Sequence, residues 1–371
     1  MLPQQEVEQD GQAAAKSPFK THRRLAALLA LLLPLAVVLV VVAALTPRPA
    51  PGVNLVSYLA APQPPRGAEV VYVGVEPIQI DSVSLETSTF DATFYIWWRW
   101  HGAIDPTTTT LVLNASTGSP DKYVTTYAYT DAQGVESPIK IGKDYNQTAL
   151  VSVEVSSPFS LSRYPLDAQT LQIHLENNTY NYDQLVYVPD TAHLSKTPGF
   201  EVSGWQLNND SLDGFLHHYS TNFGAPGPRL VNEQYSDLVY EIQVSRPFSH
   251  FLMKLLLPMF IVLLAGISAL FVKTDDFDVR LAMAATGLLT LIFLQQGYAG
   301  DLPSTAPVVV MDEIYALAYA AVGATFLRVV YTTARLRVHH GSAEAYASTD
   351  HLMAALLSVG FVVGSALLVV L

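Results

Sequence analysis

The stretch SRYPLDAQT, residues 162–170, precedes an alternating run, LQIHLEN, at 171–177. Proline fixes its own φ, and an aspartate side chain can hydrogen-bond to the backbone two residues later, so Tyr-Pro-Leu-Asp predicts a turn. Alternation of apolar and polar residues is typical of a strand with one buried face. The stretch therefore predicts a turn that leads into a strand, and the rest of the chain must show whether the turn has a further role.

Similar strand signals fill the region from 69 to 247. The segments are short, rich in β-branched and aromatic residues, and bounded by Gly, Pro, Asn or Asp. They are EVVYVGVEPIQI (69–80), FDATFYIWWRW (90–100), KYVTTYAYT (122–130), TALVSVEVSS (148–157), TLQIHLEN (170–177), LVYVPD (185–190), FEVSGWQL (200–207) and DLVYEIQVS (237–245). Because none shows a sustained helical period, this region is expected to form an all-β sandwich.

The chain is also strongly hydrophobic. Half of its 371 residues are hydrophobic, only 14% are charged, and the apolar residues gather in separate runs. A bilayer is crossed by roughly 20 apolar residues in a helix. The runs lie at 25–45, 255–272, 281–294, 314–327 and 352–371. The fold class predicted is an extracellular β-sandwich followed by a four-helix transmembrane domain, with an extra N-terminal hydrophobic helix.

Charges beside the runs indicate the topology. Lys16, Lys20, Arg23 and Arg24 precede the first run, whereas the connection 300–313 contains no Lys or Arg. Cytoplasmic loops are enriched in Lys and Arg, so the N-terminus is expected inside and the β-rich region outside. The predicted location is the cell membrane, taken as the inner membrane of a prokaryote, with several spans.

These signals divide the chain into five parts. The predicted parts are a cytoplasmic segment 1–24, a signal or anchor helix 25–45, a Pro-rich linker 46–66, an extracellular β-sandwich domain 67–247 and a transmembrane domain 248–371 with helices near 251–272, 278–299, 308–332 and 351–371. The length of 25–45 favours an anchor, whereas Val42-Ala43-Ala44 would serve as a signal-peptide cleavage site. Both interpretations stay open.

Composition and motifs exclude several functions. Residues 54–247 hold 21 acidic and 9 basic residues, so no basic face exists to bind nucleic acid. There is no cysteine, and no nucleophile, phosphate-loop or dinucleotide motif is present. His217 and His218 are adjacent on an expected strand and point to opposite faces, which favours an exposed hairpin over a metal site. We expect no metal, no cofactor and no enzymatic activity.

A stripe on the segment 278–296 suggests a pore. Its members recur at helical spacing and pass from a carboxylate through small and hydroxyl residues to large apolar residues and an amide. They are Asp278, Ala282, Thr286, Leu289, Phe293 and Gln296. This profile suits the wall of a water-filled pore with a charged ring and an apolar constriction. A buried helix face in a bundle would explain the stripe equally well.

Four segments together resemble the pentameric ligand-gated ion channels, in particular the bacterial members. SPFSLSRYPLDAQTLQIHLE (157–176) is similar to their signature loop, here without the cysteines of eukaryotic members. YEIQVSRPFSHFLMKLLLPMF (240–260) resembles the last outer strand and first channel helix. RLAMAATGLLTLIFLQQGYAGDLP (280–303) fits the pore helix, and LPSTAPVVVMDEIYALAY (302–319) fits the next loop and helix. The four occur in the family's order and cover most of 69–371.

The resemblance implies a role for the opening stretch in gating. In this family the Pro loop at 157–169 lies against the connection 300–307 and transmits ligand binding to the pore. Asp167 is expected to pair with Arg246, and Glu86 or, less favoured, Asp81 would complete the charged cluster. Side chains implied in coupling are Glu86, Tyr164, Pro165, Asp167, Arg246 and Pro303.

The resemblance also implies an agonist site built from aromatic residues. Part of the family's pattern is missing, because Trp100 is followed by His101-Gly102 and no Trp-x-Pro follows. Aromatic candidates that can cage a cation remain. These are Trp100, Tyr180, Tyr182, Tyr219 and Phe223.

The leading hypothesis is a homopentameric, cation-selective channel gated by a ligand or protons. Its expected partners are membrane lipid, an unknown small-molecule agonist or protons, and permeant monovalent cations, with no nucleic acid. The alternative is a non-conducting, membrane-anchored sensor or binding protein of the same fold. An anchored hydrolase has no nucleophile motif to support it.

Overall fold

The computed structural model describes residues 58–60, 63–116, 123–127, 129–130, 136–193, 198–221, 233–339 and 343–370. The predicted cytoplasmic segment 1–24, the hydrophobic helix 25–45, most of the linker 46–66 and the candidate Phe223 lie outside the described residues. The chain divides into two compact units. One contains Pro47–Pro258 and Phe293–Glu313, and the other contains Met259–Ile292 and Ile314–Leu371.

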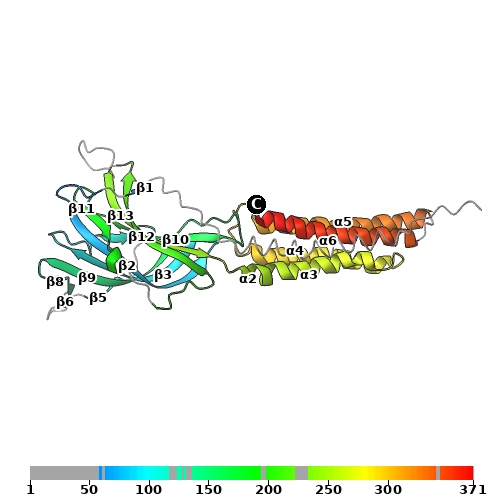
Figure 1. Cartoon of the computed structure of the whole chain (residues 1–371), viewed down its shortest axis with the longest axis horizontal. Coiled ribbons are helices and arrows are strands. Elements are labelled where there is room, and N and C mark those ends of the chain that lie inside the picture. The colour runs from blue at the N-terminus through cyan, green and yellow to red at the C-terminus, as the bar shows by residue number, and fades with distance from the viewer. Residues whose placement is uncertain are drawn as a thin grey trace, which may run out of the picture. The chain divides into compact units, whose positions relative to one another are not determined.

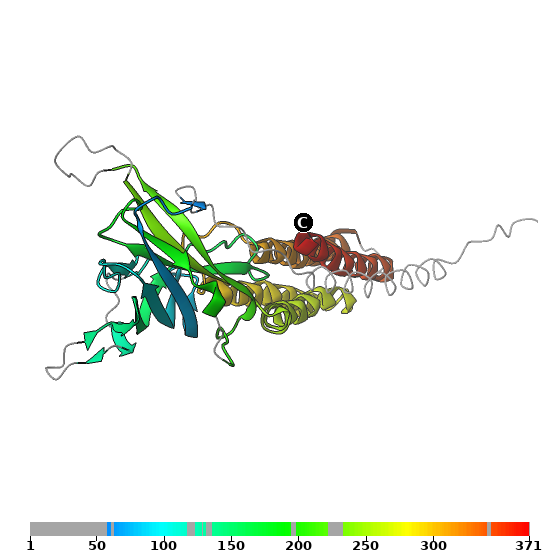
Figure 2. The ribbon, with the colours of Figure 1, turned by 60° about the vertical axis from the view of Figure 1, so that its left-hand side comes forward.

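The first unit is built on two facing sheets (Figure 2). The first sheet has the order β1 (Tyr58–Ala60), β12 (Gln206–Tyr219), β13 (Glu233–Ser245), β10 (Ala168–Asn177) and β4 (Thr110–Val112) (Figure 1). The second has the order β11 (Leu185–Pro189), β2 (Glu69–Ser84), β3 (Thr89–Trp100), β9 (Asp144–Ser156) and β5 (Tyr123–Tyr127), and β8 (Ile139–Ile141) also pairs with β9. A separate pair joins β6 (Tyr129–Thr130) and β7 (Glu136–Ser137). The predicted β-sandwich is confirmed.

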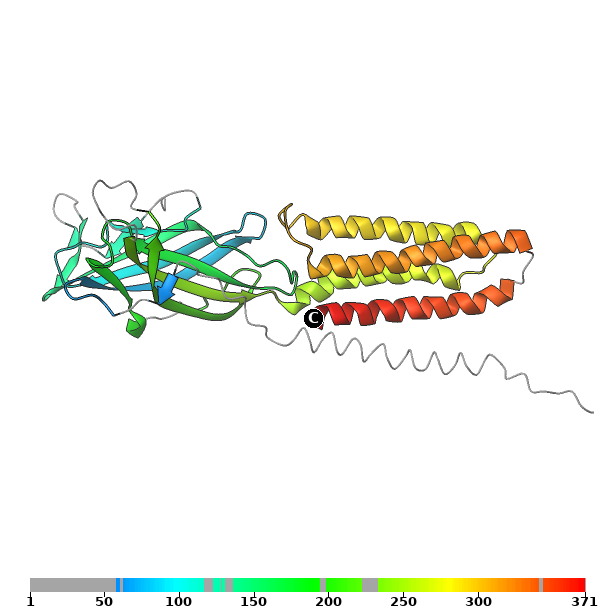
Figure 3. The same cartoon turned by 90° about the horizontal axis from the view of Figure 1, so that it is seen from above.

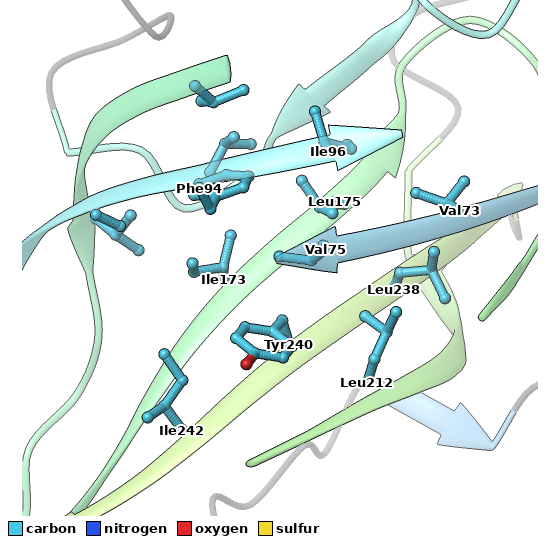
Figure 4. Packing of buried hydrophobic residues seen from close by; sticks show 14 of the residues in the cluster. Val73, Val75, Phe94, Ile96, Ile173, Leu175, Leu212, Leu238, Tyr240 and Ile242 are labelled. Carbon is cyan, nitrogen blue, oxygen red and sulfur yellow. The ribbon is translucent and has the colours of Figure 1, made fainter. Parts of the chain in front are cut away.

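The sandwich core follows from the period-two pattern. Alternate residues of β3 are buried from Phe90 to Trp100, and alternate residues of β10 from Leu171 to Leu175 face them. Side chains of both sheets interdigitate between the layers (Figure 4). Full burial of such an apolar side chain stabilises the fold by about 1.5–3 kcal/mol, so these two strands fix the register of both sheets.

Strand β10 departs from the predicted half-buried strand. Besides its apolar residues, the polar side chains Gln172, His174 and Glu176 are also buried. Its neighbour β13 likewise buries Asp237 on the face opposite to Leu238 and Tyr240. The outer face of the first sheet is therefore a packed polar layer rather than a solvated surface.

The segment 200–207 was predicted as a strand, and this prediction is wrong for most of it. Val202 makes only an isolated bridge to Ile80, and Gly204 has φ +78°, a conformation suited to a turn. The strand β12 begins at Gln206 and continues for 14 residues. Most of this strand was not predicted, because its polar residues hide the alternation. Tyr58–Ala60, predicted as linker, pairs with β12 as strand β1.

Within the described residues, four helical stretches are long and apolar enough to cross a membrane: Phe248–Phe271, Phe277–Ala299, Val310–Arg337 and Tyr346–Val370. The first joins α2 (Phe248–His250), the π-helix η2 (Phe251–Leu256), α3 (Leu257–Ile267) and the 3₁₀-helix η3 (Ser268–Phe271). The others are α4 (Phe277–Ala299), α5 (Val310–His339) and α6 (Ala343–Val370). Helices α3 to α6 run side by side (Figure 3). This matches the predicted four-helix domain.

Two glycines bring α3 and α4 close together. A Cβ atom added to Gly287 of α4 would lie 3.2 Å from the Cα atom of Gly266 of α3. Val322 of α5 packs against the same point, 3.5 Å from that Cβ position. Helices α3 and α4 therefore meet backbone to backbone, with a side chain of α5 against the contact, and larger residues would separate them.

Candidate functional site

The ion pair between Asp167 and Arg246 lies at the end of the first sheet. Strands β10 and β13 are antiparallel with Ala168 opposite Ser245, so the residue before β10 faces the residue after β13. The Nε atom of Arg246 donates to Oδ1 of Asp167 at 2.9 Å, and its backbone N–H donates to the Asp167 carbonyl at 3.2 Å. The sheet register thus forms the pair expected from the sequence.

The second oxygen of Asp167 helps to close the Pro loop. Gln169 Nε2 donates to Asp167 Oδ2 at 2.6 Å and to the Ser160 carbonyl at 2.8 Å. Gln169 Oε1 in turn accepts the Ser160 N–H at 3.0 Å. Both oxygens of a buried carboxylate are therefore satisfied, which is the condition under which a buried charge is tolerated.

Aromatic rings cover the rest of the Arg246 guanidinium. Its central carbon lies 4.3 Å from the ring centroid of Trp205 and 5.0 Å from that of Tyr164. Such contacts stabilise a cation through the negative ring faces. Trp205 was not among the predicted site residues. Its signal in the sequence is a lone tryptophan at the end of a Gly-containing turn, which indicates a packing role but names no partner.

Tyr164 links the Pro loop to the connection between α4 and α5. Its ring is buried and stacks on Tyr298 of α4, with centroids 6.1 Å apart. Its carbonyl accepts the N–H of Met311 at 3.3 Å, and the Ser162 carbonyl accepts the N–H of Val310 at the same distance. Burial raises the pKa of the Tyr164 hydroxyl, while the Arg246 guanidinium opposes that rise. The ring therefore remains a neutral packing surface.

Tyr298 is itself held by Asp312. The Tyr298 hydroxyl donates to Oδ1 of Asp312, and the other carboxylate oxygen accepts the Val309 N–H at 3.1 Å, which caps the start of α5. The Pro loop, the end of α4 and the start of α5 are thus joined within one compact unit. Sequence reasoning missed Tyr298 and Asp312 because their contact needs a fold that brings two helix ends together.

The other three predicted coupling residues, Pro165, Pro303 and Glu86, differ in how far they are buried and in what they contact. Pro165 is buried beside Tyr164, and the peptide bond between them is cis. Pro303 is half-buried and accepts a backbone hydrogen bond from Ala306. Glu86 is exposed and makes no ion pair with any described residue, so the structure does not bring it to the Asp167–Arg246 pair. Asp81 accepts a hydrogen bond from Gln79 instead.

The predicted pore stripe forms one exposed face of α4. All six residues are exposed in the single chain, including Leu289 at 53% and Phe293 at 67%. The opposite face buries Ala284, Gly287 and Leu291. The structure therefore rules out the interpretation of the stripe as a face buried within the chain's own bundle.

Arg280 lies on the buried face of α4, because two residues separate it from Asp278 and this corresponds to about 200° around a helix. Its Nη2 atom donates to Asp350 Oδ2 of α6 at 2.5 Å, and its Nε atom donates to the Ala269 carbonyl at 3.0 Å. Asp350 Oδ1 also accepts Arg328 Nε of α5 at 2.7 Å. No local pattern predicted this arrangement, because its hydrogen bonds join residues 11 to 70 positions apart.

The four aromatic candidates for an agonist site that the structure describes make separate contacts rather than one shared cage. Trp100 is buried and stacks on Tyr145, with ring centroids 5.4 Å apart. Tyr182 is buried against Val186 and Leu216, and Tyr180 packs against the sandwich core. Tyr219 lies on the face of β12 opposite to Leu216, and its hydroxyl donates to Glu176 at 2.7 Å.

Tyr219 belongs to a buried polar cluster on the outer face of the first sheet. His217 Nδ1 lies 2.5 Å from Glu176 Oε2, and His174 Nδ1 lies 2.9 Å from Asp237 Oδ2. His218 points the other way and contacts Gln234, as the alternation predicted. The expectation of an exposed hairpin is wrong for His217, whose side chain is largely covered. Within the described residues no group of three or more His, Asp or Glu side chains could hold a metal ion.

Asp237 is the most unusual member of this cluster. It is fully buried, and its Oδ1 atom has no hydrogen-bond partner in the described part of the chain. Burial raises its pKa from 3.8 to about 6, although the hydrogen bond and charge of His174 oppose that rise. The charged form of Asp237 is therefore disfavoured in the folded state.

The fold and the site define a class of protein: a chain with a β-sandwich, whose Pro loop contacts the connection between α4 and α5, and with four candidate membrane-crossing helices, one of which carries an exposed polar-to-apolar stripe. No protein-family model matches the chain. Curated relatives do match. A proton-gated ion channel of Gloeobacter violaceus is 23% identical over 238 residues, or 61% of this chain and 63% of the relative.

Two animal proteins match as well. A gamma-aminobutyric acid receptor subunit beta of Lymnaea stagnalis is 19% identical over 71% of this chain and 56% of its own length. A glutamate-gated chloride channel subunit beta of Haemonchus contortus is 25% identical over 44% of this chain and 36% of its own length. The chain thus spans less than two thirds of each of these relatives.

These relatives support the resemblance to pentameric ligand-gated ion channels that the sequence predicted. The chain is a multi-pass membrane protein with a large extracellular domain. The relatives are channels and receptor subunits, which supports the prediction that the chain is not an enzyme.

The Asp167–Arg246 pair predicts a specific pattern of stability. Asp167→Asn or Arg246→Gln leaves one partly buried charge without its partner, and each should lower stability by about 3 kcal/mol. The double variant should lose less than the sum of the two. Thermal unfolding of the purified chain in detergent measures this, with Asp183→Asn as an exposed control. Additive losses would show that the two charges do not interact.

Asp237 predicts how stability depends on pH. Because its pKa is raised to about 6 in the folded state, its contribution is fully present below pH 3.8 and is lost as pH rises through 6. The loss should amount to about 3 kcal/mol at 1.36 kcal/mol per pKa unit. Asp237→Asn should remove this dependence, and Asp213→Asn on β12, which is exposed, should not. Thermal midpoints measured from pH 4 to 7 would contradict the prediction if the wild type and Asp237→Asn changed in parallel.

Proposed function

We propose that the chain forms a homopentameric channel in which an extracellular small molecule or protons open a pore for monovalent cations. The observation that supports this most directly is the exposed stripe of α4, with Asp278 at one end and Gln296 at the other. A helix face turned to lipid is apolar throughout, because polar groups in hydrocarbon are costly. Five such faces around one axis would instead enclose water.

The proposed cation selectivity rests on Asp278. Five copies at the cytoplasmic mouth would form a carboxylate ring, and rings of Asp or Glu favour cations. One of the relatives is named as a chloride channel, so family membership alone does not decide the sign of the permeant ion. The acidic region 54–247 above the membrane would further raise the local cation concentration.

The proposed gate is Leu289, with Phe293 one turn further along. Both are large, apolar and exposed on the stripe. Where five leucine side chains converge in a narrow pore, water leaves and ions cannot pass. Thr286 lies one turn before Leu289 and would keep the neighbouring part of the pore wet.

The proposed coupling element is the Pro loop, which makes one charged contact and one aromatic contact. Asp167 fixes the end of the sheet through Arg246, and Tyr164 reaches the end of α4 through Tyr298. A displacement of β10 or β13 would therefore move the groups that hold the connection between α4 and α5. Pro165 and Pro303 are proposed to stiffen the two loops, whereas Glu86 is left without a described contact.

The proposed agonist is a small cation or the proton itself. Aromatic and acidic side chains together favour positive ligands. Trp100, Tyr180, Tyr182 and Tyr219 remain candidates, but they do not converge within one chain, so a site formed by them would need a neighbouring subunit. We propose the inner membrane of a prokaryote as the location and lipid as the surroundings of the spans.

Reversal potentials test the selectivity. In asymmetric sodium chloride the wild-type current should reverse near the sodium potential, and Asp278→Asn should shift the reversal toward chloride. Asp275→Asn, an exposed carboxylate outside the stripe, is the matched control. A wild-type current that reverses near the chloride equilibrium potential would overturn the proposal. Surface protein without current during a pH and amine screen would favour the non-conducting sensor.

Leu289→Thr tests the gate. Replacing an apolar by a hydroxyl side chain should ease wetting by about 1 kcal/mol per subunit. Over five subunits this is about 5 kcal/mol, which shifts a concerted closed–open equilibrium by three to four orders of magnitude at about 1.4 kcal/mol per tenfold. Current without agonist should therefore rise. Leu288→Thr, one position off the stripe, should change it little. Unchanged resting current in Leu289→Thr would place the gate elsewhere.

A further inference from the structure

One carboxylate joins the four membrane-crossing stretches at a single point. Asp350 of α6 accepts hydrogen bonds from Arg280 of α4 at 2.5 Å and from Arg328 of α5 at 2.7 Å. Arg280 also donates to the carbonyl of Ala269 in η3 at 3.0 Å. The side chain of Asp350 is 1% exposed, and that of Arg280 is 0% exposed. A residue of each stretch therefore takes part in one buried arrangement.

Arg280 is held there although its hydrogen bonding is incomplete. Its Nη1 atom is buried and has no partner among the described residues. An unsatisfied buried N–H of a charged group is unfavourable, so burial by itself would drive the guanidinium toward water. The attraction of the Asp350 carboxylate is the interaction that keeps it inside.

The place where the guanidinium lies matters because of its neighbour on α4. Arg280 and Asp278 are two residues apart, which is about 200° around a helix, so the two charges leave the helix on nearly opposite sides. Asp278 is exposed on the stripe, and Arg280 is not. A pentamer would contain equal numbers of both, so Asp278 can dominate the mouth only while Arg280 is kept away from it.

We propose that Asp350 is a positioning residue for ion selectivity, because it holds the Arg280 guanidinium inside the helical bundle and away from the ring of Asp278. This inference rests on the proposed cation channel. Asp350 lies on the last helix, remote in sequence from the pore helix. In this proposal it influences the electrostatic potential at the pore mouth. Without Asp350, the freed guanidinium offsets the negative ring.

Arg328 provides a control within the same arrangement. It is the second cation on Asp350, is partly exposed, and also donates to Thr349 at 2.6 Å. Arg328→Gln removes a positive charge from Asp350 but keeps the Arg280–Asp350 pair. If the cluster only stabilised the fold, loss of either arginine should affect the channel similarly. The proposed role instead predicts that ion selectivity depends on Arg280 and not on Arg328.

The experiment measures the sodium-to-chloride permeability ratio from reversal potentials, together with surface protein. Asp350→Asn should lower this ratio several-fold. Arg280→Gln should keep or raise it, and the double variant Arg280→Gln/Asp350→Asn should restore it, because no free guanidinium remains. Arg328→Gln should leave the ratio unchanged.

The outcomes separate this inference from the proposed function. A silent or chloride-selective wild type refutes the proposed channel, whatever Asp350 does. A cation-selective wild type whose Asp350→Asn variant reverses at the same potential overturns the positioning role. If Asp350→Asn alone does not reach the surface, tagged Asp350→Asn subunits co-assembled with wild-type subunits should lower the ratio in proportion to their share. Co-assembled channels with a wild-type ratio would equally overturn it.

Discussion

The need to pair a charge that has left water determines much of this structure. Arg246 follows the end of β13 and precedes the first membrane-crossing stretch, and a guanidinium cannot be buried alone without a large free-energy cost. Asp167 meets it because β10 and β13 pair in a register that places Ala168 opposite Ser245. The shape of the Pro loop follows, since the same carboxylate accepts the hydrogen bond through which Gln169 closes it. Trp205 and Tyr164 then cover the remaining faces of the guanidinium.

Features governed by local periodicity could be predicted from the sequence. The strands with regular alternation, such as β3, and the helices with long apolar runs, such as α4, were found close to their observed bounds. The exposed stripe of α4 was also predictable, because helical geometry alone assigns its members to one face. Asp167 and Arg246 were paired through resemblance to a family rather than through any local signal.

Features that depend on long-range contacts could not be predicted. Asp350 and Arg280 are 70 residues apart, and neither side chain carries a local mark of its partner. Strand β12 was missed because polar residues hide its alternation, and the contacts of its His217 and Tyr219 with Glu176 are to another strand. Alternation predicts that one face is solvated, and this holds only where no further side chains cover that face. The contact of Trp205 with Arg246 was not predicted, because a turn at Gly204 replaces the strand predicted there.

The contact between Gly266 and Gly287 bears on how these helices can move. Where two backbones touch with Val322 filling the remaining space, neither helix can rotate about its own axis without a clash. Side chains that slide past each other allow gradual adjustment, but a backbone contact of this kind acts as a pivot. Helices α3 and α4 are therefore expected to tilt relative to each other about this point. Motion at one end of α4 then becomes an opposite motion at its other end, as in a lever.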